Sequence, residues 1–370
     1  MISLKCFQLP WLQAQKARLG ARDLSMLERC IHALELVDQL QHAGLDFVFK
    51  GGTSLVLHLQ PLRRLSIDVD IACTATLTEI KRALDEVIFK GRAFTGYEHQ
   101  EHRDRADPTN MHFKVMFDSL AQHGTQSHIL LDVLNENAKD IYPALMEKDL
   151  AIVDFVETDA PAPIRVPAVD CLLGDKLTAF APLTIGVLRH PPENRAGEPA
   201  DPTNTRVAKQ LYDVSELFAV ARDLGAIRCT YETIHAAQNR YRKKSYTLED
   251  TLRDTIDAAF WFSQRDVPGG DKHHDMSDFI NEGILRLNSH LIGNKPPVLW
   301  AKAAAARAAC LAAMLLGNSH ETLDEIRANF RGTAVPSEEA FTGRHERLRH
   351  LSKTAPEAFY YWHIACGYLA

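Results

Sequence analysis

The chain has 370 residues, of which 46% are hydrophobic and 24% are charged, as in ordinary globular proteins. This length is sufficient for a large core and two domains. The net charge of −6 excludes a general attraction for nucleic acid, so a polynucleotide substrate would need a local basic surface.

The sequence predicts a cytoplasmic protein without membrane association. No charged start is followed by an apolar run, and no stretch of about 20 apolar residues is evident. The seven cysteines are scattered without a CxxC pair, which argues against a zinc site or a disulfide framework. Scattered cysteines suit a reducing compartment.

The first 165 residues alternate between predicted helices and strands. Ser25 to Glu28 has the pattern of a capping box, which predicts a helix that ends near Gly44. The apolar run 47–49 predicts a strand, and a glycine turn and a helix over 53–59 follow it. Further segments are predicted as strands over 67–72, 111–117 and 128–134 and as a helix capped at Thr76. This order predicts an α+β domain over residues 1–165.

Helical patterns dominate residues 166–370, which we expect to form a mostly helical second domain. Pro167 is predicted to open a helix that runs to Phe180, because proline is tolerated in a first turn. A loop is predicted over 182–204. The remaining helices are predicted over 205–224, 230–243, 248–263, 276–290, 298–316, 320–330 and 355–368.

A Gly-Gly turn lies between a predicted buried strand and a predicted helix. Gly51 and Gly52 would let main-chain N–H groups approach a phosphate, and a helix beginning at Thr53 would direct its positive end there. Thr53 and Ser54 add hydroxyl donors. Gly-Gly is also common in ordinary turns, so the turn alone does not establish phosphate binding.

Asp68 and Asp70 are separated by one residue on the next predicted strand. Since side chains alternate along a strand, both carboxylates project to the same face. Magnesium prefers carboxylate and phosphate oxygens. In a two-metal site, one ion activates an attacking hydroxyl and the other stabilises the leaving pyrophosphate. A lone Asp-x-Asp is often a solvated loop, but after a glycine turn it predicts magnesium-dependent nucleotidyl transfer from an NTP.

The run from Lys50 to Ile71 resembles the first motif of the AbiEii/AbiGii-type nucleotidyltransferase toxins, in the polymerase-β-like nucleotidyltransferase superfamily. That motif reads GGT(S)L, a spacer, and R-x-S-x-D-x-D. All of its positions are present, as Gly51, Gly52, Thr53, Ser54, Leu55, Arg64, Ser66, Asp68 and Asp70. The resemblance implies a polymerase-β-like domain, with a mixed sheet flanked by helices, before the helical domain.

The resemblance also implies roles for these positions. Asp68 and Asp70 would be catalytic metal ligands for Mg²⁺. Nucleotide binding is expected of the turn and of the residues before the aspartates, namely Lys50, Gly51, Gly52, Thr53, Ser54, Arg64 and Ser66. Arg64 could equally be a structural partner of a nearby aspartate.

The segment from Gly174 to Pro182 resembles the second motif of that family, GDKLTAxAP. From the sequence alone, Lys176 would be interpreted as an exposed helix lysine. The resemblance instead implies that Lys176 is a catalytic cation that contacts the triphosphate. Asp175 is expected on the helix surface or as a partner of a site residue.

The segment from Lys209 to Leu217 resembles the last motif, K-D/Q-x-x-D-L/V. Lys209 and Asp213 are four residues apart, so they share a helix face. Without the resemblance they would be a surface ion pair of small energetic value. The resemblance implies that Asp213 is an active-site acid that orients Lys176 or the incoming hydroxyl in a cleft between the domains. Lys209 would contact nucleotide or RNA.

Asp132 is the third candidate carboxylate. It lies within an apolar predicted strand, where a charged side chain needs a specific reason. Polymerase-β-like enzymes commonly use a carboxylate on a neighbouring strand as general base, so the resemblance makes Asp132 a catalytic residue and metal ligand. A hydrogen-bonded edge aspartate is an equal alternative.

Two further clusters are open to functional interpretation. The basic segment from Arg240 to Lys244, with Tyr246 close by, could bind RNA phosphates or stack on a base. A solvated helix end is the preferred interpretation. His273, His274 and Asp275 could ligate a metal, but a solvated loop is preferred.

The resemblance implies the toxin of a type IV toxin–antitoxin or abortive-infection system, with a cognate antitoxin as partner. An RNA 3′ end, particularly that of tRNA, is the leading acceptor of the nucleoside monophosphate. One alternative is nucleotidylation of a small molecule or protein. Another is a sensor that binds nucleotide without turnover, which the retention of Asp68, Asp70, Lys176 and Lys209 disfavours.

Overall fold

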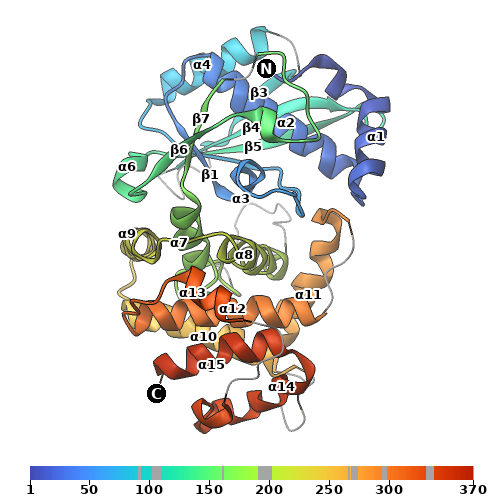
Figure 1. Cartoon of the computed structure of the whole chain (residues 1–370). Coiled ribbons are helices and arrows are strands. Elements are labelled where there is room, and N and C mark those ends of the chain that lie inside the picture. The colour runs from blue at the N-terminus through green and yellow to red at the C-terminus, as the bar shows by residue number, and fades with distance from the viewer. Residues whose placement is uncertain are drawn as a thin grey trace. The chain divides into compact units, whose positions relative to one another are not determined.

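The protein divides into two compact units in a computed structural model. The structure describes residues 1–90, 93–101, 110–160, 162–190, 202–265, 267, 274–293, 298–330 and 337–369. Unit 1 consists of Met1–Ala168 together with Asn288–Asn294, and unit 2 consists of Val169–Leu287 together with Lys295–Ala370. Figure 1 shows a sheet with helices in unit 1 and a helical unit 2.

Unit 1 is built on a mixed five-stranded sheet. Its strands are β1 (Val48–Lys50), β2 (Val69–Ala72), β3 (Gly96–His99), β4 (Asn110–Ser119) and β5 (Thr125–Leu134), in the order β1-β2-β5-β4-β3. β2 and β5 are parallel, and the other neighbouring strands are antiparallel. β6 (Leu145–Lys148) and β7 (Ile164–Pro167) form a separate antiparallel pair. The predicted α+β fold with a mixed sheet is confirmed.

The two faces of this sheet differ in chemistry. Alternate residues of the central strands are fully buried, among them Ile71, Phe113, Val115, Leu131 and Val133. Helix α2 (Leu24–His42) contacts β2, β5 and α4 (Leu77–Phe89), so these helices belong to the core. Because side chains alternate, the polar residues of the same strands lie on the opposite face.

Two helix starts in unit 1 were predicted from capping boxes, with opposite outcomes. α4 begins as predicted, because Thr76 accepts from the Glu79 N–H and Glu79 accepts from the Thr76 N–H. The capping box predicted at Ser25 is wrong, because Asp23 is the N-cap of α2 and its side chain accepts from the Ser25 N–H at 2.9 Å. Glu28 is buried and accepts instead from Ser119 Oγ and the Leu120 N–H, at 2.5 and 2.7 Å.

The remaining elements of unit 1 are short. The helix predicted over 53–59 is a single α turn, α3 (Gly51–Ser54), followed by the 3-10 turn η2 (Leu55–Leu57). The others are η1 (Leu4–Phe7), α1 (Leu9–Leu19), α6 (Ala138–Ile141) and η3 (Leu150–Ile152).

A segment from late in the sequence completes unit 1. Arg64 and Leu291 form an isolated antiparallel bridge. The Leu65 N–H donates to the His290 carbonyl at 2.7 Å, and the Ile292 N–H donates to the Arg63 carbonyl at 2.9 Å. The segment from His290 to Ile292 therefore braces the residues that lead into the Asp68–Asp70 motif.

Unit 2 is helical in the part that the structure describes. Its helices are α7 (Val169–Ala179), α8 (Thr203–Phe218), α9 (Leu224–Arg242), α10 (Leu248–Ser263), α11 (Asp275–Arg286), α12 (Val298–Leu316), α13 (Leu323–Asn329), α14 (Leu351–Thr354) and α15 (Pro356–Leu369). Its shorter 3-10 turns are η5 (Glu338–Ala340) and η6 (Gly343–His350), whereas η4 (Leu287–His290) has only its first residue in unit 2. α12 packs between α10 and α15, which run beside it in Figure 1. Pro167 does not open a helix as predicted, because it ends β7 and α7 begins at Val169.

Helix α12 contains an 18-residue segment, Leu299–Leu316, that is long and apolar enough to cross a membrane by length and composition. The sequence analysis did not identify this segment as a candidate span. Of its residues, 78% are buried inside the structure, as in a core helix. Burial by neighbouring helices accounts for its composition.

Candidate active site

A row of polar side chains crosses four strands of the unit 1 sheet. Lys50 on β1 pairs with Asp70 on β2, Asp70 pairs with Asp132 on β5, and Asp132 pairs with His112 on β4. Residues that pair directly project to the same face of a sheet. The register therefore brings together three residues predicted from sequence, Lys50, Asp70 and Asp132, and adds His112.

Asp70 and Asp132 are the central pair of this row. Neighbouring strands lie about 4.8 Å apart, so the two carboxylates are adjacent. Both residues are partly exposed, and the Asp132 side chain is 30% accessible. Two adjacent carboxylates that remain accessible can share a cation or accept a proton from a substrate hydroxyl.

His112 was missed by the sequence analysis. Its Nδ1 lies 2.6 Å from Asp132 Oδ1, and its side chain is only 9% accessible. This contact fixes the orientation of the Asp132 carboxylate. The signal available in the sequence was weak: a histidine at the polar position of a predicted strand, twenty residues before an aspartate.

Gly51 packs directly against the Asp70 carboxylate. Its φ is +76°, and a Cβ at this position would lie 2.0 Å from Asp70 Oδ2. Both the left-handed backbone and the missing side chain are therefore required here. The glycine turn and the aspartate motif, separate in the sequence, form one structural feature.

The hydroxyls of Thr53 and Ser54 are engaged within the protein. Thr53 Oγ1 donates to the Asp68 carbonyl at 2.5 Å, and Ser54 Oγ donates to the Gly51 carbonyl at 2.9 Å. Both residues are fully buried. These hydroxyls stabilise the turn against the Asp68–Asp70 segment, and their predicted role toward nucleotide phosphate stays a prediction.

Side chains alternate between exposed and buried positions from Ser66 to Asp70, as the sequence predicted for Asp68 and Asp70. Ser66, Asp68 and Asp70 are partly exposed, whereas the residues between them are buried. Asp68 lies just before the strand begins at Val69. Arg64 is buried, and its guanidinium donates to the Leu65 carbonyl at 3.2 Å. This burial supports the structural alternative for Arg64.

Lys176 and Asp213 form a buried ion pair in unit 2. Lys176 Nζ on α7 lies 3.5 Å from Asp213 Oδ2 on α8, and the side chains are 9% and 2% accessible. Gly174 brings α7 close to α9, because a Cβ there would lie 2.5 Å from the Ile227 carbonyl oxygen. Lys176 is thus not the exposed helix lysine of the simpler interpretation. A buried ammonium held beside one carboxylate can bind a second anion.

Three further candidates from the sequence remain to be located, namely Lys209, the histidine cluster at 273–275 and the basic segment at 240–244. Lys209 is a partly exposed residue of α8, one turn before Asp213. His273 lies outside the described residues. His274 caps α11 and stacks on Trp261 at 3.6 Å between ring centroids, so this histidine has a structural role. Arg242, from the basic cluster, ends α9 and lines a cavity described below.

The described residues contain no ready-made group of three or more His, Cys, Asp or Glu side chains that could hold a metal ion. Mg²⁺ commonly binds proteins through only one or two carboxylates and completes its shell with water and substrate phosphates. The adjacent Asp70 and Asp132 fit this mode. The ion predicted from Asp68, Asp70 and Asp132 stays a prediction.

Comparisons with known proteins give one family. A sequence model described as "Nucleotidyl transferase AbiEii toxin, Type IV TA system" matches residues 35–306. The search of curated proteins gives no match.

Among solved structures, the chain is similar to MenT4, a nucleotidyltransferase toxin from Mycobacterium tuberculosis H37Rv. The TM-score is 0.52 at 16% identity, with 85% of this chain and 92% of that chain covered. A putative nucleotidyltransferase from H. pylori gives a TM-score of 0.41 at 14% identity, with 79% and 97% covered. At this identity the likeness to MenT4 shows a shared fold.

Proposed function

Because the chain belongs to the AbiEii family of nucleotidyltransferase toxins of type IV toxin–antitoxin systems, we propose that it transfers a nucleoside monophosphate from an NTP to an RNA hydroxyl. The bond from the α-phosphorus to the acceptor oxygen forms, and the bond to pyrophosphate breaks. The acceptor we propose is an RNA 3′ end, with tRNA as the leading candidate. A cognate antitoxin is the proposed protein partner.

The single observation that carries this proposal is the direct pairing of Asp70 with Asp132, with Gly51 against Asp70. Nucleotidyl transfer needs an accessible pair of carboxylates held in fixed positions more than it needs covalent chemistry. The glycine contact fixes one carboxylate and His112 fixes the other.

We assign the roles of the chain's own residues as follows. Asp68, Asp70 and Asp132 would hold Mg²⁺, which when bound neutralises charge on the triphosphate. Asp132, oriented by His112, would accept the proton of the attacking hydroxyl. Lys176, held by Asp213, would contact the triphosphate.

The test is incubation of the purified chain with Mg²⁺ and each of the four NTPs, labelled at the α-phosphate, and then with total RNA or small acceptors. We expect label on RNA and its loss in the Asp68→Asn/Asp70→Asn variant. Asp118→Asn changes an exposed aspartate of β4 and serves as the matched control. Label on RNA in the double variant, or label only on small molecules or protein, would contradict the proposal.

A further inference from the structure

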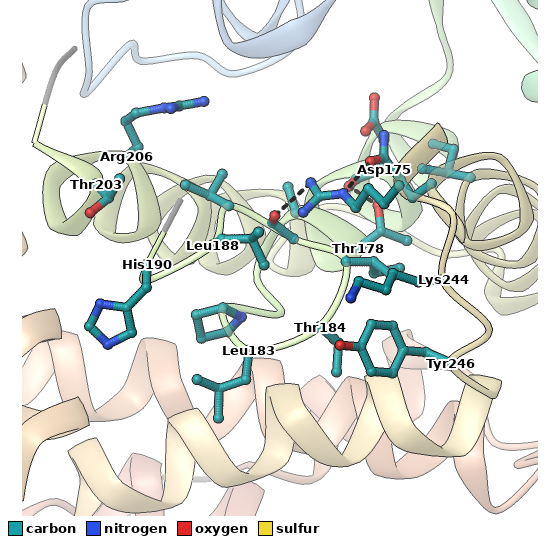
Figure 2. A pocket seen from close by; sticks show the side chains of 18 residues that line it. Asp175, Thr178, Leu183, Thr184, Leu188, His190, Thr203, Arg206, Lys244 and Tyr246 are labelled. Atoms are coloured by element: carbon teal, nitrogen blue, oxygen red, sulfur yellow. Dashed lines mark hydrogen bonds between the residues drawn. The ribbon is translucent and has the colours of Figure 1, made fainter. Parts of the chain in front are cut away.

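Unit 2 contains a cavity of about 750 Å³, and its lining includes Arg242, Lys244 and Tyr246 from the basic region that the sequence left open as an RNA-binding candidate. The cavity is formed by the C-terminal part of α7, the loop that follows, the start of α8 and the end of α9 with the segment after it. Cavities of this size bind drug-sized ligands or a single nucleotide. Figure 2 shows Arg206 and His190 on one side, Lys244 and Tyr246 on the other, and Leu188 between them.

Three permanent cations line the cavity against one carboxylate. Arg206 on α8 and Lys244 after α9 are exposed, and Arg242 at the end of α9 is partly buried, while Asp175 on α7 supplies the carboxylate. Burial, and then the neighbouring charge of Arg206, lower the pKa of Arg242. The two guanidinium groups therefore repel each other, and an anion between them would relieve that repulsion.

The rest of the lining is suited to an aromatic ring. Ile185, Leu188 and Ile234 provide apolar surface, and Tyr246 provides an aromatic ring. The Tyr246 main chain is fixed by Asn239, which donates to its carbonyl at 2.8 Å and accepts from its N–H at 3.1 Å. A fixed aromatic ring beside cations is the arrangement by which proteins bind single-stranded nucleic acid.

The cavity wall is held in place by a buried carboxylate. Asp254 Oδ2 on α10 accepts from the Leu183 N–H, the Thr184 N–H and Thr184 Oγ1, at 2.8, 2.9 and 2.8 Å. Arg242 ties the same loop to α9 by donating to the Gly186 carbonyl at 2.9 Å. A wall fixed at both ends is preorganised for a ligand.

Two lining residues share helices with the buried ion pair. Asp175 lines the cavity and directly precedes Lys176. On α8, Arg206 and Asp213 are seven residues apart, which places them on the same helix face.

We propose that this cavity binds one nucleotide of the acceptor RNA, with its base against Tyr246 and the two phosphates that flank it at Arg206 and Lys244. This inference rests on the proposed function, because it names a subsite for the acceptor. Arg206 and Lys244 lie on opposite sides of the cavity in Figure 2, as suits the successive phosphates of a strand. A free NTP also carries phosphates and an aromatic base, so the experiment compares the binding of RNA with the binding of free NTP.

The test measures binding of a fluorescent single-stranded RNA of about 12 nucleotides to the full chain, by anisotropy without NTP. We expect the Arg206→Gln/Lys244→Gln variant to bind this RNA roughly tenfold more weakly, with a salt dependence reduced by about one unit for each cation removed. We also expect Tyr246→Leu to weaken binding by about tenfold. The affinity for each free NTP should be unchanged.

Lys243→Gln is the matched control, because Lys243 is an exposed neighbour of Lys244 that does not line the cavity. Circular dichroism and thermal melting would verify that each variant is folded. RNA affinity unchanged in both test variants, an equal loss in Lys243→Gln, or weaker binding of free NTP with RNA binding intact would each overturn the inference.

Failure of the proposed function would be distinguishable from failure of this inference. Binding of RNA through the cavity needs no turnover, so it should persist in the Asp68→Asn/Asp70→Asn variant. An unmodified chain that binds the RNA through Arg206 and Lys244 but never labels RNA would support the inference and refute the proposed function.

Discussion

Asp70 and Asp132 are directly paired residues of the parallel strands β2 and β5, and they are separated by more than sixty positions in the sequence. The pairing joins two partly exposed carboxylates, each flanked by buried apolar residues of its own strand. Substitutions that disturb either carboxylate should therefore lower transfer activity.

Removal of the Asp132 charge should abolish transfer without unfolding the protein. Asp132→Asn keeps the shape and removes the proposed proton acceptor, so we expect kcat to fall by about 100-fold or more. His112→Gln keeps a polar partner but loses the imidazole, and we expect a loss of about tenfold. Radiolabel transfer and thermal melting would check both. Full activity in Asp132→Asn would remove that residue from the mechanism.

Replacement of Gly51 by alanine should damage the site more than it damages the backbone. Gly44 has φ +75°, almost the same as Gly51, but a Cβ at Gly44 would meet nothing within 4 Å. Gly44→Ala should therefore cost about 1 kcal/mol of folding free energy and leave activity intact. Gly51→Ala displaces the Asp70 carboxylate, and transfer should fall by about 100-fold. Equal activities in the two variants, by the same transfer assay, would contradict the contact's importance.

The buried pair in unit 2 should respond differently to single and double substitution. Lys176→Met leaves the Asp213 carboxylate buried without its ammonium, which should cost about 3–5 kcal/mol of unfolding free energy. Lys176→Met/Asp213→Leu should recover most of that stability. Both variants should lack transfer activity. Urea unfolding measures the stabilities, and recovered activity in the double variant would argue that the pair is structural.

Asp254 should make stability depend on pH below neutrality. Burial raises its pKa from 3.8 to about 6. The folded state therefore holds this proton more tightly than the unfolded state, so stability should rise as pH falls from about 6 to about 4. The expected gain is about 3 kcal/mol.

Asp254→Asn should remove this pH dependence. Its carbonyl oxygen can still accept from the Leu183 and Thr184 N–H groups that bond to Asp254. Urea unfolding at pH 5 and pH 7.5 compares the two proteins. The same pH dependence in both would assign the effect to another group.

Local patterns predicted the elements that depend on local contacts. The capping box at Thr76 predicted the start of α4, because both partners of that contact lie within one helical turn. The capping box predicted at Ser25 does not form, because the Glu28 carboxylate accepts a hydrogen bond from Ser119, ninety-one residues away. Pro167 fits a first helical turn as well as a strand end, and only its pairing with Leu145 decides between them.

In the candidate site, too, local contacts were predictable from the sequence and long-range contacts were not. Asp68 and Asp70 were predicted from their spacing, because alternation along a strand is a local property. The partners of Asp132 and Lys176 could not be derived from spacing, since strand register and helix packing choose them. His112 was missed for that reason, and so was the cavity, whose lining comes from four separate segments.

The bridge between Arg64 and Leu291 has a consequence for the order in which the protein is made. A ribosome produces the Asp68–Asp70 segment long before it produces the segment from His290 to Ile292, which pairs with the residues just ahead of Asp68. Domains commonly fold as units during synthesis, but unit 1 includes this late segment. A nascent chain that ends at Ala168 would therefore carry the Asp68–Asp70 segment without these hydrogen bonds. We expect the Asp68–Asp70 segment to be fully supported only in chains that extend past Ile292.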